Sequence, residues 1–369
     1  MHLWKAYRKA TSMLFVASLS ASITMAAQSA GQPSPSKHED GPYRQQATLA
    51  IRSLQKDYSL LTGLYKTTGW WNSANAITAL VDYSKSAQSD DYNYVLSNTL
   101  SAAQKKFPGF VNEYYDDEGW WALAWIDAYQ HTHDPRYLAA AEFIFKDMTY
   151  GWDNTCSGGI WWSKDRKYKN AIANELFLSV AAELAVETTD TREREEYVTW
   201  ARKEWVWFSH SGMINAKNLV NDGLDEKCQN NGRTVWTYNQ GVILGGLAAM
   251  SNIDNKPSLL LRAKEIAQAA ISNLTDAQGI LHETCEPHCG ADGTQFKGIF
   301  VRNLRILYGK DHQGSLYQHF IRTNADSIWS QTHPPDYSLG EGWSAPFGAT
   351  DASTQSSALD TLVAATLLQ

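Results

Sequence analysis

Two adjacent aspartates, Asp116 and Asp117, precede an apolar segment and are the residues best suited to chemistry. Glu118 and Gly119-Trp120-Trp121 follow them, so we expect the carboxyls at the start of a buried helix, beside indole rings. Paired carboxyls supply an acid and a nucleophile, and aromatic faces stack on sugars, which indicates carbohydrate cleavage. The helix dipole also stabilises acidic residues in a first helical turn. The alternative is therefore that the two aspartates only cap the helix.

The spacing of the two aspartates bears on the mechanism. Neighbouring residues point away from each other along a regular helix, so both can act on one bond only from a loop or a first turn. Two like charges at close range raise one pKa, and one carboxyl then stays protonated near neutral pH. Retaining glycosidases need carboxyls about 5–5.5 Å apart and inverting enzymes about 6.5–9.5 Å. Adjacent residues reach the shorter distance more easily, which favours retention.

Composition and charge narrow the class of protein. The chain has 369 residues, of which 43% are hydrophobic and 19% charged, as in a globular protein, and 15 are tryptophan. Its net charge of −7 argues against a nucleic-acid partner and favours a neutral ligand. We expect a monomer.

The N-terminus resembles a targeting segment. Lys5, Arg8 and Lys9 precede a largely apolar stretch and a group of small residues, so we predict a signal peptide at residues 1–30. An amphipathic transit peptide is the alternative. Residues 31–42 are polar and rich in Pro and Ser, as in a linker. No later stretch approaches the roughly 18 apolar residues of a membrane span, and the C-terminus has no hydrophobic tail, so we expect a secreted protein without a stable membrane anchor.

The cysteines suggest disulfides, because secretion favours oxidation. The chain has four of them: Cys156, Cys228, Cys285 and Cys289. Three pairings are possible, and we predict the short Cys285–Cys289 turn together with a Cys156–Cys228 bridge between two loops. A zinc site that includes His282 and His288 is the alternative. Asn273-Leu274-Thr275 is an N-glycosylation sequon.

From Tyr43 onward, helical segments of one kind recur about every fifty residues. Each begins with a glycine-aromatic cluster and is apolar on almost every side. The six clusters are Gly69-Trp70-Trp71, Gly119-Trp120-Trp121, Gly159-Ile160-Trp161-Trp162, Val235-Trp236-Thr237-Tyr238, Phe296-Lys297-Gly298 and Gly340-Glu341-Gly342-Trp343.

Amphipathic segments alternate with these apolar ones. They lie at 48–64, 91–106, 135–150, 191–208, 257–274 and 313–329. A helix that is apolar all round must be buried, and an amphipathic partner covers it. We therefore predict an all-α, single-domain (α/α)6 toroid over residues 43–369, with twelve main helices and the glycine-aromatic entrances at one mouth. An open helical solenoid is the alternative.

A cleft at that mouth would suit a carbohydrate, whose ring faces are apolar and whose edges are polar. The alternative for any single tryptophan is that it only fills the core. The alternative for each buried amide is that it belongs to a polar network that only stabilises the barrel. The substrate-binding candidates are Trp120, Asn170, Tyr238, Asn239, Gln240 and Lys297, and the same helices carry Asn174, Glu175, Gln295 and Arg302.

Four motifs together resemble glycoside hydrolase family 76, the α-1,6-mannanases and related fungal cell-wall transglycosidases. They are YYDDEGWWALAWIDAY, CSGGIWW followed by YKNAIANELF, VWTYNQGVILGGL and FKGIFVRNL. They occur in the family's order and cover nearly everything after the linker. The double aspartate before Gly-Trp-Trp is the specific signal.

The resemblance implies an (α/α)6 fold, a retaining mechanism, and neither a metal nor another cofactor. It implies that Asp116 is the nucleophile and Asp117 the acid/base. The Cys285–Cys289 loop resembles the fungal branch. Many fungal relatives carry a long tail with a lipid-anchor signal that this chain lacks, which favours a freely secreted enzyme.

The expected function is therefore that of a secreted endo-α-1,6-mannanase acting on mannan of the fungal cell wall. A cell-wall transglycosidase that transfers mannan-linked or lipid-anchor-glycan-linked glycoproteins onto wall polysaccharide is the first alternative, and the missing anchor argues mildly against it. A catalytically silent carbohydrate-binding protein is the second, and the intact acid pair argues against that.

Overall fold

The structure is a computed structural model that describes residues 41–311, 314–332, 334–344 and 346–368. The signal peptide expected at residues 1–30 lies outside the described residues, as does nearly all of the linker expected at 31–42.

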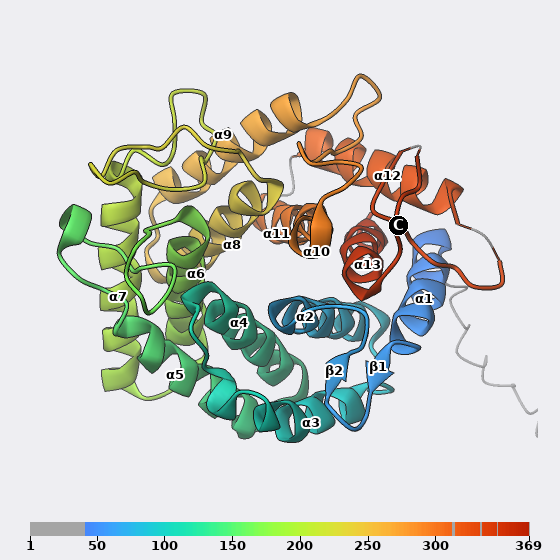
Figure 1. The fold of residues 1–369 in the computed structure, drawn as a ribbon, viewed down its shortest axis with the longest axis horizontal. Coiled ribbons are helices and arrows are strands. Elements are labelled where there is room, and N and C mark those ends of the chain that lie inside the picture. Colours follow the sequence, from blue (N-terminus) through green and yellow to red (C-terminus); the bar gives the residue numbers. More distant parts are fainter. Residues whose placement is uncertain (1–40, 312–313, 333, 345, 369) are drawn as a thin grey trace, which may run out of the picture. The chain divides into compact units, whose positions relative to one another are not determined.

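Twelve long helices of the described chain form two concentric layers (Figure 1). Consecutive inner helices pack against one another, and the last returns to the first, so the ring is closed. The prediction of an (α/α)6 toroid is confirmed, and the open solenoid is excluded. The inner helices are α2 (Trp70–Ala87), α4 (Tyr115–Thr132), α6 (Ala171–Glu187), α8 (Thr237–Ile253), α11 (Phe296–Lys310) and α13 (Ala352–Thr366). The outer helices are α1 (Pro42–Gln55), α3 (Asn93–Ala102), α5 (Pro135–Thr149), α7 (Thr191–His210), α9 (Pro257–Leu274) and α12 (Ser315–Ser330).

Burial separates the two layers as the sequence pattern predicted. Fourteen of the fifteen residues of α13 are buried, whereas only six of the twenty residues of α7 are buried. An inner helix is covered on every side by its two neighbours, its outer partner and the barrel interior. Within the described residues, none of the helices combines the length and the apolar character that a membrane span requires.

The helix predicted over residues 48–64 is too long. Helix α1 ends at Gln55, and the next residues form a short antiparallel hairpin of β1 (Tyr58–Ser59) and β2 (Leu64–Tyr65). Gly63 in its turn has a φ of +68°, and a Cβ there would lie 3.0 Å from the backbone of Thr99. The left-handed conformation and the close contact both require glycine, and they end the helical pattern.

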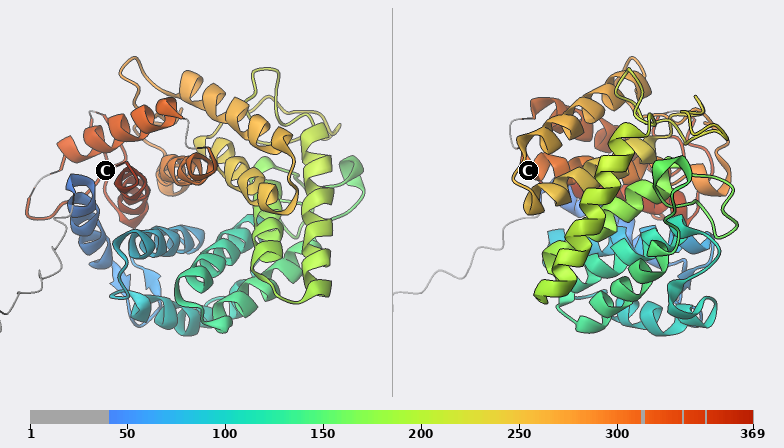
Figure 2. Two further views of the ribbon diagram at one scale, coloured as in Figure 1. Left: turned by 180° about the vertical axis from the view of Figure 1, so that it is seen from behind. Right: turned by 90° about the vertical axis from the view of Figure 1, so that its left-hand side faces the viewer.

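Two of the six glycine-aromatic clusters do not open a helix. Trp161 and Trp162 lie in the loop that precedes α6, and Trp343 lies in the loop that precedes α13. The loop after α5 (150–170) and the loop after α7 (211–236) project from the same end of the ring (Figure 2, right). The mouth of the barrel is therefore built from loops as well as from helix starts.

Buried amide side chains hold these loops to the inner helices. Asn174 Oδ1 accepts from Ile160 N at 2.7 Å, and its Nδ2 donates to Ile160 O at 3.0 Å. Gln240 bonds Val220 in the same way, at 2.7 and 2.8 Å. Each amide thus satisfies the backbone N–H and C=O of one loop residue, which explains why polar residues occur within apolar helices.

The disulfides pair Cys156 with Cys228 and Cys285 with Cys289, as we predicted. Both sulfurs near His282 are therefore in a disulfide and cannot act as thiolate ligands for zinc. The His282 ring instead contacts two carboxylates.

The expected glycosylation site, Asn273, is exposed in the last turn of α9. Its Nδ2 donates to Ala269 O at 2.8 Å, so the acceptor nitrogen bonds to its own helix. Glycosylation there remains a prediction.

Candidate active site

The two aspartates lie in the first turn of α4, as we expected from their adjacency. The helix begins after Tyr114, whose backbone is extended at a φ of −120° and a ψ of 121°. Tyr115 N donates to Trp162 O at 2.9 Å, which attaches the loop before α6 to the start of α4. The bend at this helix start allows adjacent carboxyls to reach one cleft.

Each aspartate has its own hydrogen-bond donor. Trp162 Nε1 donates to Asp116 Oδ2 at 2.9 Å, and Asn112 Nδ2 donates to Asp117 Oδ2 at 2.6 Å. Asn112 Oδ1 accepts from Tyr114 N at 2.8 Å, which fixes the Asn112 amide. Asp116 Oδ1 is buried and has no hydrogen-bond partner among the described residues.

Burial raises the pKa of both carboxyls. Burial and then the charge of Asp117 raise the pKa of Asp116 well above its ordinary value, and burial raises the pKa of Asp117 to about 6. The donors from Trp162 and Asn112 act in the opposite direction, because they favour the ionised forms. The pair therefore holds a shared proton near neutral pH, and its titration belongs to both residues.

The third acid of the motif, Glu118, contacts a lysine in the protein interior and does not reach the cleft. Glu118 is fully buried, and its Oε1 contacts Lys164 Nζ at 2.8 Å. The same ammonium contacts Asp147 at 2.8 Å. Lys164 is two residues from Trp162, so this ion pair fixes the loop that supplies the donor to Asp116. Glu118 does not line the cleft.

The two aspartates open onto a cleft of about 530 Å³ at the mouth of the barrel. The Trp120 ring is 3% exposed and lies 5.7 Å from the Trp71 ring and 6.4 Å from the Tyr238 ring, centroid to centroid. Both pairs are stacked, so the cleft has an aromatic wall. The cleft is lined by Trp71, Tyr114, Asp116, Asp117, Trp120, Trp162, Tyr168, Asn170, Asp222, Tyr238, Asp292 and Phe296.

Each Gly-Trp-Trp cluster at a helix start serves both the core and the cleft. Trp70 and Trp121 pack together in the core at 4.8 Å between ring centroids. Their neighbours Trp71 and Trp120 line the cleft. Consecutive helical residues diverge by about 100°, so one tryptophan faces the outer layer while the next faces the barrel mouth.

Three of the six binding candidates lie in the cleft with the acid pair: Trp120, Asn170 and Tyr238. Asn170 Oδ1 also accepts from Ala173 N at 3.3 Å, so this residue caps α6. The structure thus brings these three side chains to the same opening as Asp116 and Asp117.

The other three candidates, Asn239, Gln240 and Lys297, are buried and do not line the cleft. Gln240 uses its amide to hold Val220, as described above. Lys297 Nζ contacts Glu286 and donates to a backbone carbonyl at 2.9 Å. The side-chain atoms of Asn239 have no partner among the described residues. Gln240 and Lys297 thus hold neighbouring segments, as in the alternative of a buried polar network, whereas the contacts of Asn239 show no such role.

Sequence reasoning did not single out Tyr168, Asp222 or Asp292. Tyr168 Oη donates to Asp222 Oδ2 at 2.5 Å and accepts from Asn231 Nδ2 at 2.8 Å. Tyr168 stands at the start of the YKNAIANELF motif, which was a usable signal. Asp222 and Asp292 lie in polar loops without periodicity, where nothing distinguishes a cleft residue from a solvated one.

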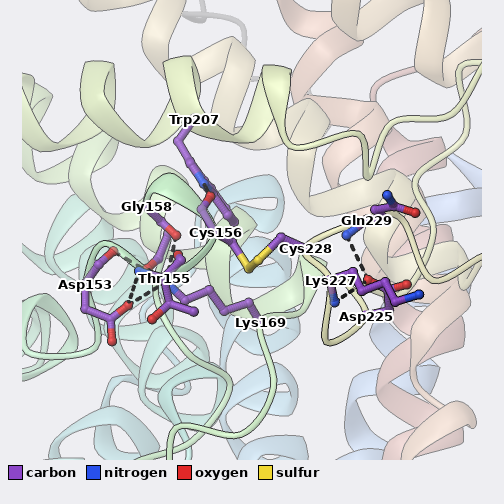
Figure 3. The surroundings of a disulfide bond; sticks show 11 residues. Asp153, Thr155, Cys156, Gly158, Lys169, Trp207, Asp225, Lys227, Cys228 and Gln229 are labelled. Carbon is purple, nitrogen blue, oxygen red and sulfur yellow. Dashed lines mark hydrogen bonds and ion pairs between the residues drawn. A yellow bond between two sulfur atoms is a disulfide. The ribbon is translucent and has the colours of Figure 1, made fainter.

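The Cys156–Cys228 disulfide connects two loops that line the cleft (Figure 3). The loop after α5 carries Trp162, and the loop after α7 carries Asp222. Beside the disulfide, Lys169 Nζ contacts Asp153 Oδ1 at 3.0 Å and three backbone carbonyls at 2.7–2.9 Å. The disulfide and the buried ammonium together fix the loop segment that precedes Asn170.

We expect the two disulfides to differ in their effect on stability. Cys156 and Cys228 are 72 residues apart, and Cys285 and Cys289 are four apart. A disulfide restricts the unfolded chain, and it does so more when it closes a longer loop. Replacement of both cysteines of a pair by Ser should therefore lower the free energy of unfolding by about 4 kcal/mol for the first pair and about 2 kcal/mol for the second. Urea unfolding of both variants tests this, and equal losses would contradict it.

Comparison with known proteins now places the chain. The sequence profile of glycosyl hydrolase family 76 matches residues 46–369. The chain belongs to glycosyl hydrolase family 76.

Curated relatives within family 76 are fungal. The chain is 28% identical over 264 residues to mannan endo-1,6-alpha-mannosidase DCW1 of Candida albicans, and 29% identical over 298 residues to DCW1 of Saccharomyces cerevisiae. These matches cover 64% and 71% of this chain. The chain spans only 58% and 64% of the length of those two relatives.

Solved family 76 structures share the fold. A variant of the α-1,6-mannanase GH76A of Salegentibacter superposes with a TM-score of 0.80 at 22% identity and covers 89% of this chain and all of that one. That variant is described as inactive, has two consecutive aspartates replaced by alanine, and is in complex with an α-1,6-mannotetraose. Dfg5 of Chaetomium thermophilum, in complex with glucosamine, superposes with a TM-score of 0.77 at 22% identity. The match covers 88% of this chain and 90% of that one.

The acid pair of this family 76 protein predicts a bell-shaped dependence of kcat/KM on pH. Below about pH 6, protonation of Asp117 as well as Asp116 leaves no ionised carboxyl, so we expect activity to rise with pH through about 6. At higher pH the shared proton is lost and activity falls. Initial rates on an unbranched α-1,6-manno-oligosaccharide between pH 4 and 9 test this, and a steady decline from pH 5 to 7 would contradict it.

Proposed function

We propose that this protein hydrolyses α-1,6-mannosidic bonds within mannan, with Asp116 and Asp117 as the catalytic carboxyls. The observation that supports this most is the acid pair itself. Two carboxyls with separate donors open onto a cleft with an aromatic wall, and one oxygen of Asp116 has no protein partner. The curated relatives described as mannan endo-1,6-alpha-mannosidases support the choice of bond.

Burial favours the proton of the pair on Asp116 in the free protein. The proposed first step starts from the other form, in which that proton lies on Asp117 and an oxygen of ionised Asp116 attacks the anomeric carbon of the sugar. The new C1–O bond forms as the bond from C1 to the leaving oxygen breaks, and the Asp117 proton moves to that oxygen. The Trp162 indole donates to Asp116 Oδ2 and so stabilises the ionised form that attacks. The hydrogen bond from Asn112 then stabilises Asp117 as it becomes a carboxylate.

In the second step, Asp117 removes a proton from water, and the water oxygen replaces Asp116 at the anomeric carbon. Two displacements at one carbon restore its configuration, so the product retains the α-anomeric form. The pKa of Asp117, about 6, suits a group that gives a proton in one step and takes one in the next.

The proposed substrate contacts follow from the cleft. Trp71 and Tyr238 are partly exposed and offer ring surface to the apolar face of a sugar, while Trp120 is 3% exposed and supports both rings from behind. Asn170 and Asp222 offer polar atoms to the sugar hydroxyls. The complexes of the Salegentibacter mannanase with α-1,6-linked oligosaccharides support a substrate of this class. The inactivity of its double aspartate variant supports a catalytic role for an adjacent aspartate pair.

Digestion of unbranched α-1,6-mannan tests the proposed function. We expect a ladder of α-1,6-manno-oligosaccharides, because an endo-acting enzyme cuts within the chain. A second digest with added mannobiose as acceptor distinguishes transfer, since transfer products outgrow hydrolysis products as the acceptor concentration rises. Failure of the mannan to be shortened in either digest would contradict the proposal.

We further propose that residues 43–369 form the catalytic domain and that the protein is secreted. The continuous ring from α1 to α13 supports the first statement. Two disulfides support the second, because disulfides persist in oxidising compartments.

A further inference from the structure

The cleft is acidic throughout. Four of its lining residues are aspartates, and no lining residue among those described is Lys, Arg or His. Two cations lie near the cleft: Lys106 Nζ is 5.9 Å from the Trp70 ring, which is not in the lining, and the Arg233 guanidinium is 5.8 Å from the ring of Tyr168, a lining residue. The catalytic pair explains two of the four acids. The proposed mechanism gives Asp222 and Asp292 no bond to form or break, although the charge of Asp292 adds to the rise in the pKa of Asp117.

Asp292 is fixed at the rim of the cleft. It lies in the short helix α10 (Gly290–Gly293), directly after the Cys285–Cys289 disulfide. Its Oδ1 accepts from Trp71 Nε1 at 2.9 Å. A Cβ on Gly293 would lie 2.8 Å from Cys289 Cβ, so the chain after Asp292 packs directly on the disulfide. The carboxylate is exposed but its position is fixed.

Asp222 differs from Asp292 in being largely engaged. Its Oδ2 accepts from Tyr168 Oη, and its side chain is only partly exposed. Asp292 is therefore the acid most open to an approaching ligand that is not also part of the catalytic pair. Uncharged hydroxyls can donate to such a carboxylate, whereas a phosphate or carboxylate on the sugar is repelled by it.

We propose that the cleft selects uncharged mannan and that Asp292 is a specificity-determining residue that rejects sugars carrying an anionic group such as phosphate. This rests on the proposed function, since it concerns the substrate of the same site. Discrimination arises because no lining cation compensates the repulsion. Two unit charges about 8 Å apart near a protein surface interact strongly enough to change affinity about fivefold to thirtyfold at low salt.

Binding measured without turnover tests the inference. All proteins in this test carry Asp116→Asn and Asp117→Asn, which remove catalysis. The protein with these two changes alone, called the parent, keeps Asp292. Calorimetry compares α-1,6-mannotriose with two forms that carry one phosphate, at the non-reducing or at the reducing end. We expect the parent to favour the neutral triose, and Asp292→Asn to reduce this preference about fivefold to thirtyfold in 20 mM salt. In 1 M salt the effect of Asp292→Asn should largely disappear, because the screening length falls to about 3 Å.

Asp91→Asn is the matched control. Asp91 is exposed next to the start of α3 in the outer layer, so its replacement removes the same net charge away from the cleft. We expect it to leave the preference unchanged. Equal affinity of the parent for neutral and phosphorylated trioses, or an equal effect of the two substitutions, would overturn the role of Asp292 and leave the proposed function standing. Failure of the neutral triose to bind would overturn both.

Discussion

Replacement of Asp116 by Ala is expected to lower the rate of mannan cleavage by about 10⁴-fold or more. In the proposed mechanism no other group can form the bond to the anomeric carbon. Trp162 donates to Asp116 and Asn112 donates to Asp117, so each carboxyl is held separately and neither replaces the other. The loss should be similar on every substrate, including those with good leaving groups, because the nucleophile is needed whatever group departs. Initial rates on mannan and on an aryl α-mannoside measure it.

Glu118→Gln provides the control for Asp116→Ala. Glu118 is also an acid in the first turn of α4, but it is buried against Lys164 and does not line the cleft. Gln can still accept from Lys164 and from the backbone of Asn112, so we expect kcat on mannan to stay within about tenfold of the wild type. Activity retained by Asp116→Ala would mean that the pair only caps the helix, which was the alternative reading of the motif.

Replacement of Asp117 by Ala is expected to separate two kinds of substrate. On mannan, the loss of the proton donor should lower kcat/KM by about 10²–10⁴-fold. On a 2,4-dinitrophenyl α-mannoside the leaving group needs no proton, so the first step should remain fast and a covalent mannosyl-enzyme should accumulate. Rapid-quench kinetics and the mass of the intact protein detect that intermediate.

Added azide sharpens the test of Asp117. Azide attacks without a general base, so it should restore turnover of the aryl substrate by Asp117→Ala and yield a mannosyl azide. Asp116→Ala should show no covalent intermediate. An equal loss on both substrates for Asp117→Ala would contradict its role as acid/base.

The architecture could be predicted because it depends on periodic features. Two kinds of helix that repeat every fifty residues imply an inner and an outer layer. Helix α13 has fourteen buried residues and belongs to the inner layer, although many of its residues are Ser or Thr. The hairpin at Tyr58–Tyr65 was missed because it depends on one glycine and on a contact with α3, neither of which is periodic.

The candidate site was predictable where a motif places a side chain at a helix start, as for Asp116, Trp120 and Tyr238. Gln240 and Lys297 show the limit of that reasoning. Both stand near helix starts, yet one turn of the helix directs Gln240 to a loop and Lys297 to the carbonyl of Glu341. The direction in which a side chain points near a helix start depends on the loops that pack there. The sequence pattern does not specify how those loops pack.

Loop residues were harder to predict still. Trp162 lies in a motif, but its role as the donor to Asp116 depends on the pairing of its loop with the start of α4. Asp222 and Asp292 are brought to the cleft by contacts between segments far apart in sequence, from Tyr168 and from Trp71. Such contacts follow from the closed ring and not from any local pattern.

Proton NMR of the first product formed from reduced α-1,6-mannotetraose tests the central claim most directly. The acid pair acting by double displacement predicts that the newly released reducing end appears first as the α-anomer and equilibrates to the β-anomer only by slow mutarotation. An initial β-anomer would contradict the covalent intermediate on Asp116, and with it the roles given to both aspartates.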